Sequence, residues 1–190
     1  MGDVGIPEPY SRSSYPAGQR TEAALKDGAI ISVRPIRPED TPLLVEFFNG
    51  LSEDSIVFRF LGPLKALPAE WVMRFTRIDY TQDVALVAAK EIESRERLLG
   101  VCRIMRKPRS TSGELAVVID DAWQGKGLGK MLSQRCIGIA KGLGMKSIWG
   151  IVSAQNKKFL ALAEKLGFTI EIEPGADVYR INMDLTSNSR

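Results

Sequence analysis

Hydrophobic and polar positions alternate in several parts of this chain, and the alternation predicts seven strands. Residues 30–36 alternate apolar and polar side chains, which is typical of a strand buried on one face. From residue 84 onwards, three more such runs follow one another along the chain. Their charged or Ser- and Gly-rich connections suit hairpins, so we expect three neighbouring antiparallel strands. The predicted strands span residues 30–36, 84–90, 98–105, 114–119, 147–152, 168–172 and 178–183.

Apolar side chains three and four positions apart predict helices between these strands. Three short helices are expected between residues 41 and 75, a longer one from about residue 127 to 141, and another at 157–166. The 127–141 helix carries an apolar stripe that should lie on the sheet. The order of elements therefore predicts a mixed α/β (α+β) layer architecture without internal repeats.

The 190 residues are enough for one globular domain. Residues 1–28 contain Pro7, Pro9 and Pro16 and show no hydrophobic period, so we expect a flexible N-terminal arm or linker before a domain at 29–185 and a tail at 186–190. The longest apolar runs fall far short of the roughly 20 residues that a membrane-spanning helix needs. We therefore expect no membrane association and a cytoplasmic location.

The chain contains no histidine. This absence excludes catalysis by a Ser-His-Asp or Cys-His arrangement and removes the commonest metal ligand, so we expect no metal site. Cys102 and Cys136 lie 34 positions apart in a predicted strand and a predicted helix, without the spacing of a zinc or redox pair. We interpret both as buried core thiols.

Positive charge is concentrated in the second half of the chain. The net charge is only +3, yet residues 122–166 hold eight Lys and Arg and a single acidic residue, Glu164. This concentration favours an anionic ligand. Nucleic acid is a weak candidate, because only Trp149 and Phe159 could stack on bases in this segment and no RNA-binding signature is present.

A glycine-rich loop at residues 124–130 follows a predicted strand and opens the long helix. Glycines allow close backbone approach, and the first N–H groups of a helix together with its dipole favour a phosphate. The spacing differs from that of dinucleotide-binding loops, and Met131 stands where a P-loop needs Ser or Thr. The loop is either an anion site assisted by Lys126 and Lys130 or a flexible turn with solvated lysines.

Two ordered motifs resemble those of the GNAT superfamily of acyl-CoA-dependent N-acyltransferases. Gln124-x-x-Gly127-x-Gly129 is similar to its pyrophosphate-binding Q/R-x-x-G-x-G/A motif, and residues 156–168 are similar to its N-x-x-A-x-x-x-Y-E-K-x-G-F stretch. The resemblance covers residues 29–185. It implies a central, mostly antiparallel mixed sheet of six to seven strands with helices on both faces, splayed at the acyl-CoA site between the strands of Val118 and Ile151.

Shorter stretches resemble the bacterial Pat-type protein lysine acetyltransferases within that superfamily. They include residues 33–40, 51–55, 78–80 and 114–118. Residues 6–10 and 26–28 resemble the linker that follows a large acyl-CoA-synthetase-like region in many of these enzymes. The sequence does not include that region, which fits either a stand-alone enzyme or a domain of a longer protein. The resemblance implies acetyl-CoA as co-substrate and, as partner, a lysine-bearing protein such as an acyl-CoA synthetase.

The resemblance also implies roles for particular residues. Glu114 matches the glutamate that serves as general base, since a lysine amine with a pKa of about 10.4 must lose a proton before it attacks. The alternative is a solvated carboxylate at a strand end. The expected coenzyme-binding residues are Val117, Val118, Ile119, Gln124, Gly125, Lys126, Gly127, Leu128, Gly129, Lys130 and Asn156.

Other positions leave alternatives open. The backbone at residues 117–119 should bind the pantetheine and polarise the thioester carbonyl, while Asn156 either contacts the pantetheine or caps a helix. Ala163 stands where many relatives carry a tyrosine general acid, so either solvent, Tyr80 or Tyr179 takes that role. The arginines near the acceptor side are expected to form ordinary ion pairs; they are Arg34, Arg37 and Arg59.

Three functional hypotheses follow. The first is direct transfer of acetyl from acetyl-CoA to a protein lysine in a ternary complex, because neither cysteine has a histidine partner for a covalent intermediate. The second is acetylation of a small amine, favoured by a deep acidic acceptor pocket. The third is an acyl-CoA-binding regulatory domain without turnover.

Overall fold

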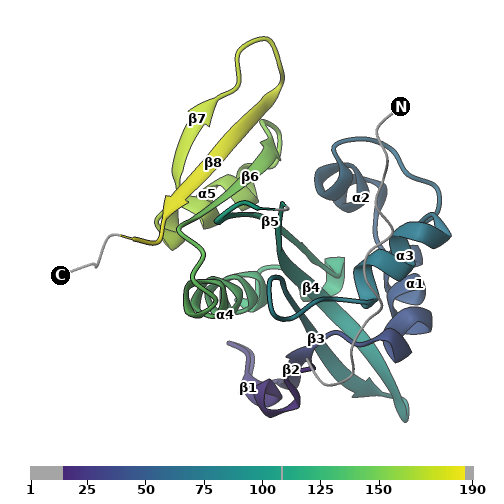
Figure 1. Ribbon diagram of the computed structural model, residues 1–190. Helices are drawn as coiled ribbons and strands as arrows, with labels where there is room; N and C mark the ends of the chain where they lie inside the picture. Colours follow the sequence, from purple (N-terminus) through teal and green to yellow (C-terminus); the bar gives the residue numbers. More distant parts are fainter. Residues whose placement is uncertain (1–14, 108, 187–190) are drawn as a thin grey trace.

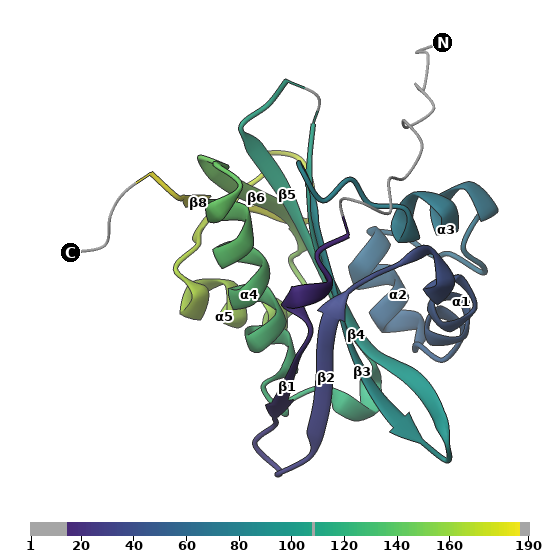
Figure 2. The same ribbon diagram turned by 60° about the horizontal axis from the view of Figure 1, so that its bottom comes forward.

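The computed structural model describes residues 15–107 and 109–186, which form a single sheet with helices on both faces (Figures 1 and 2). The strands are β1 (Thr21–Ala24), β2 (Ile30–Pro35), β3 (Val84–Ile92), β4 (Arg95–Arg106), β5 (Ser112–Ile119), β6 (Ser147–Ser153), β7 (Thr169–Ile172) and β8 (Val178–Asp184). The helices are α1 (Thr41–Asn49), α2 (Glu53–Phe60), α3 (Ala69–Thr76), α4 (Leu128–Gly142) and α5 (Lys157–Leu166). Short 3₁₀ turns are η2 (Ala17–Gln19), η3 (Pro38–Asp40) and η4 (Asp121–Trp123).

The eight strands lie in the order β1-β2-β3-β4-β5-β6-β8-β7. Every neighbouring pair is antiparallel except β5 and β6, which are parallel because α4 connects them. Helices α1, α2 and α3 cover one face of the sheet, and α4 and α5 cover the other (Figure 2). The expected mostly antiparallel mixed sheet with helices on both faces is confirmed.

Side chains of the central strands alternate between two cores. On β4, Cys102 and Ile104 pack into the core beneath α4 and α5, whereas Val101 packs into the core beneath α1, α2 and α3. Cys102 and Cys136 are both fully buried in the first core, and the Cys136 thiol donates to the Cys102 carbonyl at 3.6 Å. The interpretation of both cysteines as core thiols is confirmed.

The described part of the expected N-terminal arm is built into the fold. Thr21–Ala24 forms the edge strand β1 on β2, which gives eight strands where six to seven were expected. Leu25 is buried beside them in the first core, and the Tyr15 hydroxyl donates to the Pro35 carbonyl at 3.0 Å. The sequence does not reveal β1 because four mostly exposed residues show no alternation, and its stability comes from backbone pairing with β2. Residues 1–14 and 187–190 lie outside the described residues.

Candidate active site

A cleft of about 1350 Å³ opens where β5 and β6 separate. The two strands pair at only three positions, the last being Glu114 opposite Trp149. Beyond that point β5 continues to Ile119 and β6 to Ser153 along opposite walls of the cleft. In Figure 1, β6, β7 and β8 diverge from the rest of the sheet. The expected splay between the strands of Val118 and Ile151 is therefore present.

The glycine loop forms the end of this cleft at the start of α4. Gly125 and Gly127 have φ angles of +77° and +92°, a backbone region that strongly favours glycine. Gly127 is the N-cap residue of α4 and has no side chain to accept a hydrogen bond. It therefore leaves the first N–H groups of the helix available to a ligand. Gly129 and Lys130 also line the cleft. A helix N-terminus with flanking lysines suits the pyrophosphate of a coenzyme A.

The lysines around the loop are arranged differently from the expectation. Lys126 does not line the cleft, because its ammonium pairs with Asp27 at 3.0 Å and lies 4.6 Å from the centroid of the Trp123 ring. This contact lowers the pKa of Asp27. The side chain of Leu128 is likewise buried in the core.

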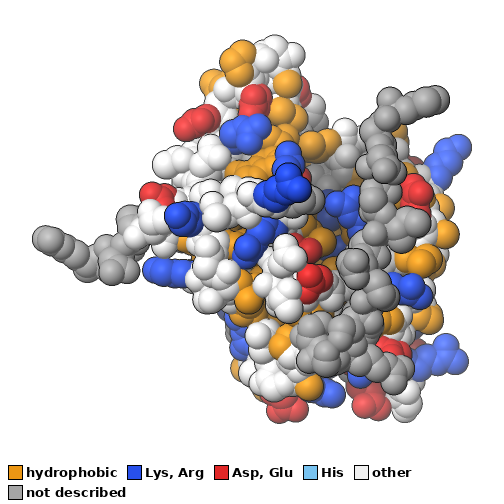
Figure 3. Space-filling model, in the orientation of Figure 1, with side chains coloured by type: hydrophobic (Ala, Val, Ile, Leu, Met, Phe, Trp, Pro, Cys, Tyr) orange, Lys and Arg blue, Asp and Glu red, His pale blue; other side chains and the backbone are white. Residues whose placement is uncertain are grey.

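Lys26 lines the cleft where Lys126 was expected. It comes from the turn between β1 and β2, and its side chain passes 3.6 Å from the point where a Cβ on Gly127 would lie. Lys130, Lys157 and Lys158 line the same cleft. In Figure 3, Lys and Arg side chains gather across the middle of this face, between the β6–β8 strands and the helices α2 and α3. Sequence reasoning missed Lys26 because it lies about 100 positions before the loop and within the segment interpreted as an arm.

Gln124 fixes the loop to helix α2. Its amide donates to the Ser55 hydroxyl at 3.1 Å and to the Ile119 carbonyl at 3.2 Å. Asp121 accepts hydrogen bonds from both hydroxyls of Ser52 and Ser55, each at 2.8 Å. Burial acts to raise the pKa of Asp121, but these hydrogen bonds outweigh it and the pKa is lowered. The motif glutamine thus connects the glycine loop to helix α2 and to the end of β5.

The remaining expected binding residues lie on the cleft walls. Val117, Val118 and Ile119 line it along β5, where β6 no longer pairs with them. Asn156 lines it at the start of α5, and its side-chain oxygen accepts from the Phe159 N–H at 3.1 Å. Asn156 is therefore a helix cap placed at the cleft.

Glu114 lies at the point where the splay begins. It is exposed, lines the cleft, and forms no hydrogen bond or ion pair through its side chain with any described residue. On the opposite strand it faces Met105. An ionised carboxylate with unused acceptor sites can take a proton from a nearby amine.

Neither candidate tyrosine lines the cleft. The buried Tyr80 hydroxyl donates to the carbonyls of Ile36 and Ala85, on the face beneath α1 and α3. Tyr179 lies on β8, paired with Val152 and Ile172. Ala163 is fully buried in the core beneath α5. Within residues 15–107 and 109–186, no tyrosine is positioned to protonate a leaving thiolate at the cleft.

Two of the three arginines expected to form ion pairs do so. Arg34 is 1% exposed and donates to both carboxylate oxygens of Asp40 at 2.6 and 2.8 Å and to Glu96 at 3.0 Å. Desolvation opposes its charge, but these two carboxylates raise its pKa above the ordinary value. Arg37 pairs with Asp40 at 3.5 Å.

Arg59 does not follow the expectation. Its guanidinium forms no ion pair with a described residue and lies 4.8 Å from the centroid of the Phe60 ring. Arg103, which sequence reasoning missed, is 4% exposed and lies 4.1 Å from the Phe75 ring centroid. Burial lowers the pKa of Arg59 to about 10 and that of Arg103 to about 9, the charge of Arg59 adding to the second effect. The sequence signal that could have identified Arg103 is its charge within an otherwise apolar predicted strand.

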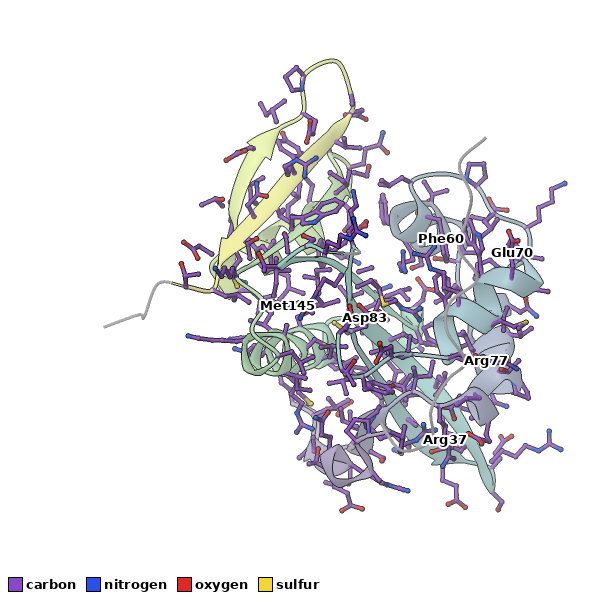
Figure 4. The ribbon with its side chains drawn as sticks, viewed as in Figure 1. Arg37, Phe60, Glu70, Arg77, Asp83 and Met145 are labelled. Carbon is purple, nitrogen blue, oxygen red and sulfur yellow. The ribbon has the colours of Figure 1, made fainter. Side chains whose placement is uncertain are left out.

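Figure 4 shows Phe60 and Arg37 at opposite ends of the helical layer. Phe60 lies on the part of the helical layer that faces β5 and β6, whereas Arg37 lies at the other end of that layer. Arg59, Arg103 and Phe60 all line the cleft, and Arg34 and Arg37 do not.

The described residues contain no cluster of three potential metal-ligating side chains. Among the same residues, no helix has the length and apolar character that crossing a bilayer requires.

Residues 31–169 match the family model described as an acetyltransferase (GNAT) domain. The chain belongs to the GNAT acetyltransferase family. It is 33% identical over 167 residues to the acetyltransferase PA5475 of Pseudomonas aeruginosa, covering 86% of this chain and 90% of that protein. GNAT membership, inferred from the two motifs, is confirmed, and the protein is an N-acetyltransferase.

Solved structures agree with this assignment. The GNAT domain of S. lividans PAT is 28% identical, with a TM-score of 0.80 over 90% of this chain and 99% of that one. A GNAT superfamily phosphinothricin acetyltransferase from Sinorhizobium meliloti, crystallised with AcCoA, shares the fold at 19% identity, with a TM-score of 0.65 over 81% of this chain and 88% of that one. As in the family to which the chain belongs, acetyl-CoA is the co-substrate, and the glycine loop, the start of α4 and the open edge of β5 provide a fitting site for it.

Proposed function

We propose that this GNAT enzyme transfers acetyl from acetyl-CoA directly to a primary amine, with Glu114 as the general base. The observation that carries the proposal is the position of Glu114 at the last paired residue of β5, where the cleft begins. The first acceptor class to consider is a protein lysine, supported by the likeness to the S. lividans PAT domain over nearly the whole chain. An acyl-CoA synthetase is the first such protein to test.

The coenzyme would lie along the open edge of β5. The N–H groups at the start of α4, with Lys130 and Lys26, would bind its pyrophosphate. The backbone of residues 117–119 would bind the pantetheine, since β6 leaves that edge without a strand partner. One of these N–H groups would stabilise the negative charge that develops on the thioester oxygen.

The chemical step needs a neutral amine close to the thioester. An alkylammonium has a pKa of about 10.4, so Glu114 first takes a proton from it, and the neutral nitrogen then attacks the carbonyl carbon. The N–C bond forms, the nitrogen gives its second proton to solvent, the C–S bond breaks with its electron pair on sulfur, and coenzyme A leaves as a thiolate that solvent protonates. Cys102 and Cys136 lie in the core, which supports transfer without an acyl-enzyme.

A second acceptor class, a small amine, is favoured by a specific observation. The acceptor side of the cleft contains two arginines, Arg59 and Arg103, that form no ion pair with a described carboxylate, which suits an amine that carries its own negative charge. The structural neighbour named for phosphinothricin, a small amine with anionic groups, agrees with this class. A cationic polyamine, in contrast, is disfavoured by the same arginines.

Thiol release from acetyl-CoA by the purified protein tests the proposal. Acceptors should include an acyl-CoA synthetase, lysine peptides, amino acids and polyamines, with acetyl-CoA binding measured in parallel by calorimetry. Turnover with at least one amine, and its loss in Glu114→Gln with coenzyme binding retained, would support the proposal. Tight coenzyme binding without turnover on any acceptor would instead indicate a regulatory acyl-CoA-binding domain.

A further inference from the structure

Two arginines, the half-buried Arg59 and the buried Arg103, line the acceptor side of the cleft, and neither has a carboxylate partner among the described residues. Arg59 comes from the last turn of α2 and Arg103 from the middle of β4. The Nη1 atom of Arg103 is buried and has no hydrogen-bond partner among the residues that the structure describes. Both guanidinium groups lie over the same ring, Phe75, at 5.9 Å and 4.1 Å from its centroid.

Other charged residues on this side of the cleft do not neutralise the pair. Glu114, Asp54 and Arg74 also line the cleft, but neither carboxylate lies within 4.0 Å of Arg59 or Arg103. Glu114 acts on Arg59 only at longer range. Two like charges so placed repel one another and have lost much of their hydration, and contact with an aromatic face recovers only part of that cost.

The register of the sheet places this pair next to the proposed base. Arg103 stands opposite Ala116 on β5, and Met105 stands opposite Glu114. Because side chains alternate along a strand, Arg103 and Glu114 lie on the same face, on neighbouring strands and one diagonal step apart. An amine at Glu114 and an anion at the arginines can therefore belong to one acceptor molecule.

We propose that Arg59 and Arg103 bind a carboxylate, or a similar oxyanion, of the acceptor beside its reacting amine. The guanidinium groups would supply the paired, charge-assisted hydrogen bonds that such anions accept. This inference rests on the proposed amine acetylation and specifies its substrate class as an anionic amine. The carboxylate could belong to a free amino acid or to an acidic side chain beside a protein lysine, and the chemistry of recognition is shared.

Paired acceptors that differ only in charge test this site. The first arm compares ω-amino acids, from glycine to 6-aminohexanoate, with their amides, so that the spacing between amine and anion varies. The second arm compares lysine peptides carrying Glu beside the lysine with matched peptides carrying Gln. For the best acceptor, we expect kcat/KM to be at least roughly tenfold higher for the carboxylate form, and the better arm identifies the source of the anion.

Arg103→Met and Arg59→Met should each reduce this carboxylate-to-amide ratio towards one, mainly through KM. Arg97→Met is the matched control, because Arg97 is half-exposed and pairs with Glu46 at 3.8 Å away from the cleft. If Arg103→Met does not fold, the carboxylate-to-amide ratio of Arg59→Met alone decides the outcome. A ratio near one in both arms for the wild type, or a ratio unchanged in both variants, would overturn the proposal.

A binding readout separates this inference from the proposed reaction. With coenzyme A present, the carboxylate acceptors should raise the melting temperature of the wild type more than their amides do, and Arg103→Met or Arg59→Met should abolish the difference. That result without turnover on any acceptor would support the anion site while refuting amine acetylation. Equal shifts for carboxylates and amides would count against the anion site whatever the turnover.

Discussion

Arg34 and Arg103 occupy the same face of the sheet and are both almost fully buried, yet their surroundings are opposite. Arg34, 1% exposed, binds Asp40 through two hydrogen bonds and also reaches Glu96. Arg103, 4% exposed, has an aromatic ring and a second arginine instead of a carboxylate. A buried charge that the protein itself neutralises stabilises the architecture, whereas one left without a partner beside a cleft indicates a ligand.

The same contrast applies to the lysines around the glycine loop. Lys126 pairs with Asp27, whereas Lys26 and Lys130 line the cleft and form no ion pair with a described residue. The role of a charged side chain is therefore determined by whether a partner carboxylate lies beside it in the folded protein, and not by its residue type or its place in a motif.

The largest expected effect concerns Glu114, a carboxylate at the start of the splay that pairs with no described cation. Glu114→Gln should lower kcat by roughly 10²–10⁴-fold at neutral pH, because the acceptor amine loses its base. The deficit should shrink as pH rises towards the amine pKa of about 10.4, since the free amine then forms without help. Steady-state kinetics between pH 7 and 10 checks both statements.

Glu96 offers a control for this prediction, because it is a carboxylate on the same sheet that pairs with Arg34 away from the cleft. Glu96→Gln should leave the pH profile of turnover unchanged. If Glu114→Gln also leaves kcat unchanged, the base lies elsewhere and Glu114 is only a solvated carboxylate.

The second prediction concerns the neutralised arginine. Arg34→Met should destabilise the protein by about 3–5 kcal/mol, because the buried Asp40 carboxylate loses its two short hydrogen bonds to the guanidinium and, among the described residues, keeps only its contacts with Arg37. Chemical denaturation monitored by circular dichroism measures this change. The removal of the exposed Arg97–Glu46 pair, in contrast, should cost less than about 1 kcal/mol. Similar losses for both would contradict the role assigned to Arg34.

Most of the fold is predictable from the sequence, because hydrophobic periodicity records which face of each element is buried. The helix Lys157–Leu166 has its predicted bounds, and the seven predicted strands all exist. The exception is β1, whose four mostly exposed residues have no periodicity to detect. Its pairing with β2 depends on backbone hydrogen bonds, which any sequence can form.

The site is predictable only where a local motif describes it. Gln124, Gly125, Gly127 and Gly129 lie on the cleft because one short segment folds into a strand, a loop and a helix start. Residues distant in sequence decide which lysine reaches the loop. They also decide which arginine has no carboxylate partner. Lys26 is thus absent from the motif, and Arg59 was expected to pair although the fold gives it no carboxylate.

The third prediction separates the lysines at the coenzyme site. Lys26→Ala and Lys130→Ala should each weaken acetyl-CoA binding by about three- to tenfold, with a dependence on salt, because each removes one cation from the phosphate site. Lys126→Ala should have a smaller effect, since its charge already pairs with Asp27. Calorimetric dissociation constants at two ionic strengths check the order, and the reverse order would assign the phosphate contact to Lys126.

The most direct test of the account compares the unfolding free energies of Arg103→Met and Arg34→Met under the same conditions without ligand. Folding lowers the pKa of Arg103 to about 9, so the charged form is disfavoured in the folded state, and this cost is fully present at neutral pH. The account predicts that Arg103→Met leaves the unfolding free energy unchanged or raises it, while Arg34→Met lowers it strongly. Equal losses in both variants would show that Arg103 stabilises the fold and would contradict its assignment to a ligand.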